Sequence, residues 1–74
     1  MVVEVRLFAT FRKGRFPKKQ MELPEGTSLK DLFKQLKIPA KQVGILLVNG
    51  LRVVHEQKLC PHDVVSIFPL IAGG

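Results

Sequence analysis

A single stretch with the spacing of an amphipathic helix sets the main limit on how this chain can fold. Its apolar side chains recur at i, i+3, i+4 and i+7 and form one stripe: Leu29, Leu32, Phe33 and Leu36. Thr27 or Ser28 provides an N-cap, and Asp31 stands three positions after Ser28, as in a capping box. Because Pro39 cannot continue a helix, we expect the helix to run over 29–37.

Most of the remaining chain alternates apolar and polar residues, which is the pattern of strands with one buried face. We expect strands at residues 2–10, 18–23, 43–48, 51–54 and 64–70. Asn49-Gly50 predicts a tight hairpin turn, and Pro61 to Asp63 is expected to form a single helical turn in the loop before the last strand. One helix can cover only one face of a four- or five-stranded mixed sheet. The sequence therefore predicts an α+β domain over 1–70 and a flexible tail over 71–74.

The alternation also predicts which side chains lie on the uncovered face of the sheet. If Val65 and Ile67 point toward the helix, Phe68 points away from it, in the same sense as Phe8 on the first strand. Phe8 and Phe68 then form an exposed apolar patch if the first and last strands are neighbours, and large exposed patches usually mark an interaction site. The alternative is that the stems of Arg6 and nearby lysines shield both rings.

The last residues carry the most distinctive chemical group of the sequence, the α-carboxylate of Gly74. Gly73 and Gly74 have no side chains, so the tail can enter a narrow slot, and the carboxylate is an ionised oxygen nucleophile at neutral pH. Pro69 has no N–H to donate and indicates where strand pairing stops. The alternative is a frayed end without a role.

The formal net charge is +6, and the surplus lies mainly in one loop that contains no acidic residue. The loop residues are Arg12, Lys13, Arg15, Lys18 and Lys19. Such a cluster can attract phosphate, nucleic acid or an acidic protein surface. Nucleic-acid sites usually add stacking aromatics, and only Phe16 is interleaved here, so a solvated turn is the favoured interpretation.

Several classes of function are disfavoured by what the sequence contains. No apolar run approaches the roughly 20 residues of a membrane span, and the start lacks a signal-peptide pattern, so we expect a cytoplasmic protein with no membrane partner. Cys60, the only cysteine, is expected to be a small buried apolar residue. His55 and His62 match no standard metal-ligand spacing, and no catalytic motif is present. We expect neither a metal site nor catalysis by this chain alone.

With these elements placed, the chain resembles the MoaD/ThiS family of sulfur-carrier proteins over nearly its whole length. The similarity is most specific in Leu7-Phe8-Ala9-Thr10-Phe11-Arg12 and in Phe68-Pro69-Leu70-Ile71-Ala72-Gly73-Gly74, and it is greatest to the molybdopterin synthase small subunit. The resemblance implies the ubiquitin-like β-grasp fold, in which the first and last strands are parallel neighbours at the sheet centre.

The resemblance also implies a function in which the chain is a protein co-substrate and not an enzyme. An ATP-dependent, ubiquitin-activating-like enzyme of the MoeB/ThiF type would adenylate Gly74, and a sulfur donor would convert it to a thiocarboxylate. A larger synthase subunit of the MoaE type would then use that sulfur to make molybdopterin, with no cofactor bound by this chain itself. The residues implied to bind these partners are Phe8, Phe68, Ile71, Ala72 and Gly73.

Three alternatives remain open at this point. The first is a carrier for thiamine biosynthesis that serves a thiazole synthase and shares the Gly-Gly end. The second is a ubiquitin-like modifier joined to lysines through Gly74, and the third is a basic nucleic-acid-binding domain that uses the loop from Arg12 to Lys19.

Overall fold

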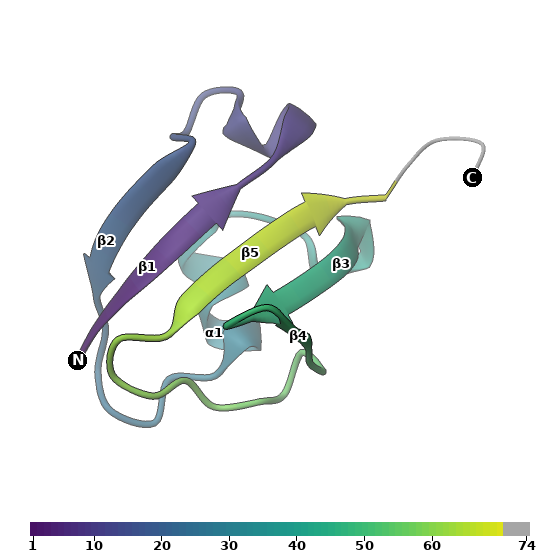
Figure 1. The fold of residues 1–74 in the computed structure, drawn as a ribbon. Coiled ribbons are helices and arrows are strands. Elements are labelled where there is room, and N and C mark those ends of the chain that lie inside the picture. Colours follow the sequence, from purple (N-terminus) through teal and green to yellow (C-terminus); the bar gives the residue numbers. More distant parts are fainter. Residues whose placement is uncertain (71–74) are drawn as a thin grey trace.

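The computed structural model describes residues 1–70 as a five-stranded mixed sheet with one α-helix packed against one of its faces (Figure 1). The strands are β1 (Val2–Leu7), β2 (Lys18–Glu22), β3 (Val43–Val48), β4 (Leu51–Arg52) and β5 (Val64–Pro69). The helix is α1 (Leu29–Leu36), and two short 3-10 helices are η1 (Ala9–Arg12) and η2 (Ala40–Gln42). No helix among these residues is long and apolar enough to cross a membrane.

The sheet is organised around a central parallel pair of strands from opposite ends of the chain. The strand order is β2-β1-β5-β3-β4, with β1 parallel to β5 and all other neighbours antiparallel. The register pairs Val5 with Val65 and Leu7 with Ile67. All four of these side chains are fully buried under α1, which confirms the predicted inward face.

The core is a single apolar cluster between the sheet and α1. The predicted helical stripe supplies four of its members, and the helix begins as expected: Ser28 Oγ accepts the Asp31 N–H, and the Asp31 carboxylate accepts the Ser28 N–H. At the other end the helix stops at Leu36, one residue earlier than predicted. Lys37 takes the left-handed conformation, with φ 58°, and its N–H returns to helix carbonyls.

The hairpin turn between β3 and β4 is held to the start of β5 by a small polar network. Asn49 and Gly50 both have positive φ, 53° and 82°, as the Asn-Gly pair predicts. The Asn49 amide donates to Asp63 Oδ1 at 2.9 Å, and its carbonyl oxygen accepts the Val64 N–H at 2.9 Å. Asp63 Oδ2 accepts the Cys60 N–H at 2.8 Å. This partly buried network, centred on the buried Asp63, fixes the loop that leads into the central strand.

The predicted first strand is too long at its end. It stops at Leu7, not Thr10, because Phe8 N–H pairs with Ile67 O and Ala9 then takes φ 52°, which starts η1. Ala9 is therefore exposed, and Phe11 of η1 is buried in the core.

Predictions for the segment between β3 and β5 also need correction. The fourth strand is only Leu51–Arg52, shorter than the expected 51–54. The loop has no helical turn at Pro61; the chain turns there with the Asp63 N–H bonded to Cys60 O and His62 at φ 69°. The last strand ends at Pro69, one residue before the predicted end. Cys60 is exposed and not buried, because Leu59 fills the core position beside it.

Candidate functional site

The central strand β5 carries the chain out of the sheet at one end of the molecule, next to β3 and η2 (Figure 1). Pro69 still pairs with Val43, and the Leu70 N–H donates to Gln42 O at 2.9 Å. The direction in which the chain leaves is therefore fixed up to Leu70. The predicted site residues Ile71, Ala72, Gly73 and Gly74 lie outside the described residues, and the assignment of a tail over 71–74 stays a prediction.

Gly44 on β3 lies directly against this exit and was not identified from the sequence. A Cβ placed on it would come 2.7 Å from Pro69 O, which real Cβ atoms essentially never show, and 3.0 Å from Leu70 Cα, which is tighter than most real contacts. The β3–β5 register shifts at this point, between Val43 and Ile45. Only a residue without a side chain lets the two backbones pass at this distance. A glycine inside an apolar strand is the sequence signal of such a contact.

The uncovered face of the sheet carries an aromatic pair at the root of the exit. The rings of Phe8 and Phe68 stack with centroids 4.1 Å apart and planes 9° from parallel, at the ends of neighbouring strands as the predicted patch required. Ile45 of β3 pairs with Phe68 across the sheet and is 40% exposed. We call Phe8, Ile45 and Phe68 the outer patch. Leu70, two residues after Phe68, is 62% exposed, so exposed apolar side chains follow the chain to the start of the tail.

The outer patch is shielded on one side only. The Arg12 guanidinium carbon lies 5.2 Å from the centre of the Phe8 ring, and its Nε donates to Leu7 O at 2.6 Å. Arg12, and not Arg6, is therefore the cation that covers part of the patch, since Arg6 pairs with Glu4. Both phenylalanines remain only half-buried. The two sequence interpretations, a patch and a shielded pair, each describe part of the arrangement.

A second arginine of the basic loop has a structural role. Arg15 reaches across to the end of α1, where Nε donates to Leu36 O at 3.0 Å and Nη2 donates to Lys37 O at 3.1 Å. Its Nη1 also donates to Phe11 O at 3.2 Å. A cation that bonds the last carbonyls of a helix stabilises them both by hydrogen bonding and by charge. The interpretation of the loop as a simple solvated turn is thus incomplete.

Replacing Arg15 by alanine is expected to lower the free energy of unfolding by about 1–3 kcal/mol, because it leaves three carbonyls without this donor. Lys13→Ala is the matched control, since Lys13 is exposed in the same loop and its side chain makes no hydrogen bond to residues 1–70. Urea unfolding of both variants measures the difference. Equal stability of the two variants would contradict the capping role.

The structure brings together two of the six predicted site residues, Phe8 and Phe68, and adds Gln42, Gly44 and Ile45 at the same place. Within residues 1–70, no three side chains of His, Cys, Asp or Glu lie close enough to hold a metal ion. The site thus consists of an apolar surface, a fixed chain exit and backbone contacts that hold the exit.

A mixed sheet with a parallel central pair formed by the first and last strands, crossed on one face by a single helix, defines the ubiquitin-like β-grasp fold. Sequence comparison identifies the family within that fold: the profile of the ThiS family matches residues 5–74, and the chain belongs to this family. The expected membership of the MoaD/ThiS group is confirmed. Comparison with curated protein sequences gave no match.

Three solved structures illustrate the likeness. A protein from Pyrococcus furiosus assigned as molybdopterin converting factor, subunit 1, is 31% identical, with TM-score 0.77 over 96% of this chain and 99% of that one. A chain in a complex of subunits 1 and 2 of molybdopterin-converting factor from Helicobacter pylori 26695 is 22% identical, with TM-score 0.68 and full coverage of both chains. Small archaeal modifier protein 1 of Haloferax volcanii is 15% identical, with TM-score 0.75 over 95% and 98%.

Proposed function

We propose that this chain is a sulfur carrier for molybdopterin biosynthesis, in which the carboxylate of Gly74 becomes a thiocarboxylate. The observation that carries the proposal is the placement of the outer patch at the root of the segment that leads to Gly73-Gly74. A partner that binds the patch would receive the end of the chain in a defined direction, because Pro69 and Leu70 are tethered to β3 and to Gln42. Docking would then set a high local concentration of the reactive group.

The chemistry we propose needs two partner enzymes and no cofactor on this chain. The Gly74 carboxylate attacks the α-phosphate of ATP in an activating enzyme of the MoeB/ThiF type, and pyrophosphate leaves. A sulfide equivalent then attacks the acyl carbon and forms a carbon–sulfur bond, and the carbon–oxygen bond to the phosphate breaks as AMP leaves with that oxygen. The resulting thiocarboxylate donates its sulfur in a larger synthase subunit, so this chain is consumed as a co-substrate and reloaded. Because the cycle consumes ATP, we propose that it takes place in the cytoplasm.

Two of the solved structures support the pterin branch as the destination of the sulfur. The relative from Pyrococcus furiosus that is assigned to molybdopterin conversion matches along almost its entire length. The Helicobacter pylori likeness comes from a complex of the two subunits of molybdopterin-converting factor, which supports a synthase large subunit of the MoaE type as the partner here. A thiazole synthase is the alternative acceptor of the same thiocarboxylate.

A ubiquitin-like modifier is the second candidate, because the fold is shared with small archaeal modifier protein 1. It would use the same activated carboxylate but transfer it to lysine side chains. Intact mass separates the possibilities after incubation with ATP, an activating enzyme of the MoeB/ThiF type and sulfide. Replacement of one oxygen by sulfur, mapped to Gly74, supports the carrier. Higher-mass conjugates with other proteins, without sulfur incorporation, would support the modifier and overturn the carrier.

The outer patch gives a separate test of docking. Phe68→Asp is expected to weaken binding to the synthase large subunit by at least about 30-fold, because it places a charge in the apolar centre of the contact. Leu51→Asp is the control, since Leu51 is 71% exposed on β4 and is not part of the patch. Calorimetric titration measures both variants, after melting curves have established that they fold. Unchanged affinity of a Phe8→Asp/Phe68→Asp double variant would remove the patch from the interface.

A further inference from the structure

The charged residues of this chain are divided between its two ends. We define the exit end by the segments 8–19, 34–44 and 66–70, which contain eight Lys or Arg residues and no Asp or Glu. The basic residues of the exit end are Arg12, Lys13, Arg15, Lys18, Lys19, Lys34, Lys37 and Lys41. The rest of the chain holds four Lys or Arg and all six Asp and Glu, so the formal charge is +8 for the exit end and −2 for the remainder.

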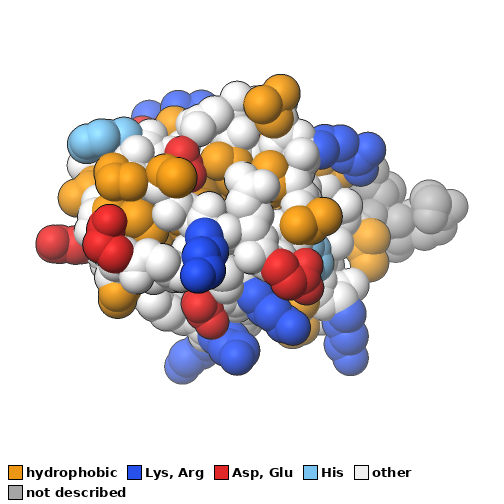
Figure 2. Space-filling view, turned by 90° about the horizontal axis from the view of Figure 1, so that it is seen from below, with side chains coloured by type: hydrophobic (Ala, Val, Ile, Leu, Met, Phe, Trp, Pro, Cys, Tyr) orange, Lys and Arg blue, Asp and Glu red, His pale blue; other side chains and the backbone are white. Residues whose placement is uncertain are grey.

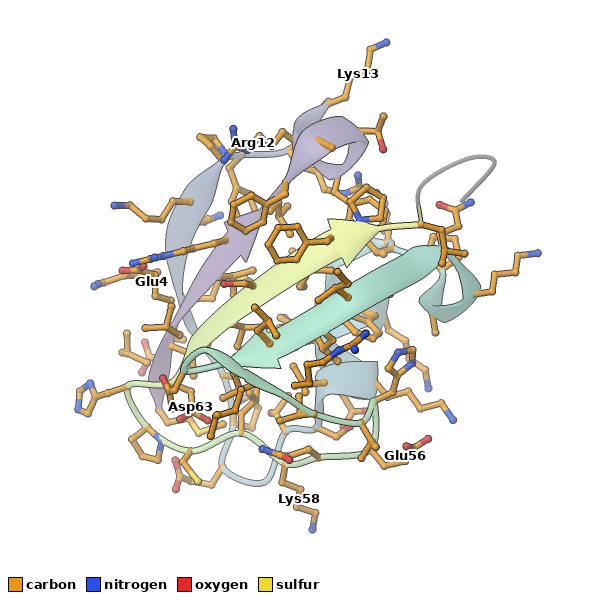
Figure 3. The ribbon with its side chains drawn as sticks, turned by 45° about the vertical axis from the view of Figure 1, so that its right-hand side comes forward. Glu4, Arg12, Lys13, Glu56, Lys58 and Asp63 are labelled. Carbon is orange, nitrogen blue, oxygen red and sulfur yellow. The ribbon has the colours of Figure 1, made fainter. Side chains whose placement is uncertain are left out.

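Contacts between distant parts of the sequence bring the exit-end segments together. Phe8 N–H donates to Ile67 O at 3.2 Å, Leu70 N–H donates to Gln42 O at 2.9 Å, and Arg15 bonds the end of α1. In Figure 3, Arg12 and Lys13 lie at the end from which the chain leaves, whereas Glu56 and Asp63 lie at the opposite end. Figure 2 views the molecule from below, and on that face acidic and basic side chains are interspersed.

Only some of the basic side chains at the exit end make contacts that stabilise the fold. Arg15 bonds the helix end, and Arg12 bonds Leu7 O and lies over Phe8. Lys13 and Lys41 are exposed, and their side chains make no hydrogen bond or ion pair with other residues of 1–70. Lysines flanking the exit without an acidic neighbour repel one another, so the fold itself gains nothing from their being gathered there.

We propose that the exit end is an electrostatic docking surface for an acidic protein surface, namely a rim of Asp and Glu side chains around the slot that receives the tail. This inference rests on the proposed sulfur-carrier function and adds to it the charge of the partner surface. The outer patch supplies the apolar contact, and the exit-end lysines flank it. The occupant is therefore a protein with acidic groups surrounding an apolar docking site.

An acidic protein fits the described surface better than a nucleic acid does. Binding of single-stranded nucleic acid relies on aromatic rings that are free to stack with bases. At the exit end, Phe8 is stacked on Phe68 and Phe11 is buried. The Phe16 ring has Lys19 Nζ 5.6 Å from its centre. The cations are present, but each of these rings already has a partner within the chain.

The separation of charge also orients the molecule as it approaches. With positive charge around the exit and a net negative charge over the rest of the chain, an acidic rim attracts the exit end and repels the opposite one. Such steering acts on the association rate and weakens as salt shortens the Debye length to about 8 Å at physiological ionic strength. The dissociation rate depends mainly on the apolar contact.

The test compares two charge reversals in the full chain. Lys13→Glu/Lys41→Glu changes the exit end, and Lys30→Glu/Lys58→Glu is the matched control at the other end, since all four side chains are exposed. Stopped-flow association with the activating enzyme and with the synthase large subunit of the same organism is measured from about 50 to 500 mM NaCl. We expect the exit-end variant to associate about 10-fold more slowly at low salt, with the difference largely lost at high salt. The control variant should stay within about twofold of the unmodified chain.

Equal association rates for the two variants, or rates that do not fall with salt, would overturn the inference. Tighter binding of a single-stranded DNA oligonucleotide than of either enzyme, lost in the exit-end variant, would assign the surface to nucleic acid and overturn it as well. The intact-mass assay is run on the same samples. Sulfur loading without a rate difference rejects only the electrostatic inference, whereas no loading of the unmodified chain rejects the sulfur-carrier proposal on which it rests.

Discussion

Deleting Gly74 is expected to abolish sulfur transfer and leave the stability of the fold unchanged. The deletion moves the terminal carboxylate back by one residue, about 3.5 Å of extended chain. A displacement of 1 Å at a reacting centre can cost about 100-fold in rate, so the shortened chain should transfer at least 100-fold more slowly. Within residues 1–70 the buried core residues lie between Val3 and Ile67, and the deletion removes none of these. Single-turnover sulfur transfer and a thermal melt measure the two effects separately.

Two further variants separate the position of the carboxylate from the width of the tail. Gly74→Ala keeps the length of the chain and adds one methyl group, so it should retain more activity than the deletion. Gly73→Arg also keeps the length, but its side chain would obstruct a narrow slot, and we expect transfer to be lost. A Gly74 deletion that transfers sulfur at the normal rate would show that this carboxylate is not the reactive group. If a variant had a lowered melting temperature, its loss of sulfur transfer would be explained by unfolding instead.

The sequence predicts well those parts of the fold whose conformation is determined by residues close to one another in the chain. The stripe from Leu29 to Leu36 has one period that only a helix satisfies, and Ser28 with Asp31 defines where the helix begins. Asn49-Gly50 adopts positive φ at both residues because few other pairs do so readily. The alternation in β5 separates Ile67 from Phe68, and this placed one partner of the aromatic pair correctly.

Errors arise where a contact from elsewhere in the chain decides the conformation. The residues after Leu7 continue the alternation of β1, so two or three positions cannot distinguish a strand from the turn that follows it. The end of β1 is decided by the bond from Phe8 N–H to Ile67 O and by the burial of Phe11 in the core. Neither contact can be inferred from the neighbouring residues in the sequence. Cys60 was misplaced for a similar reason: Leu59 occupies the core position beside it, and the turn is held by a bond from the Cys60 N–H to the Asp63 carboxylate.

The residues of the candidate site also fall into those that the sequence predicted and those that depend on tertiary contacts. Phe8 and Phe68 could be paired from their strands because the family resemblance supplied the strand order, which periodicity alone does not contain. Gly44 was missed because its importance depends on the path of β5 as it leaves the sheet, a tertiary property. The basic loop was only partly interpreted, since a sequence cannot show that Arg15 reaches the end of α1.

Gly44→Ala is expected to slow sulfur transfer more than its effect on stability explains. A methyl group at this position would meet Pro69 O at 2.7 Å and Leu70 Cα at 3.0 Å, and both are backbone atoms that cannot rotate away. The end of β5 must therefore move by several tenths of an ångström or more. Overpacking of this kind costs about 1–3 kcal/mol of folding free energy. Because Leu70 leads directly to the reactive end, the shift also redirects the tail relative to the outer patch.

Gly26→Ala is the matched control for this variant. Gly26 has φ 83°, and nothing lies within 4 Å of a Cβ placed there, so alanine strains the backbone at the opposite end without displacing the exit. Both variants are compared in single-turnover sulfur transfer at a temperature where melting curves show each to be folded. We expect transfer to fall by about 10- to 100-fold for Gly44→Ala and to remain normal for Gly26→Ala. If both variants transfer at the unmodified rate, the contact at Gly44 stabilises the sheet but does not aim the tail, and positioning must come from the partner alone.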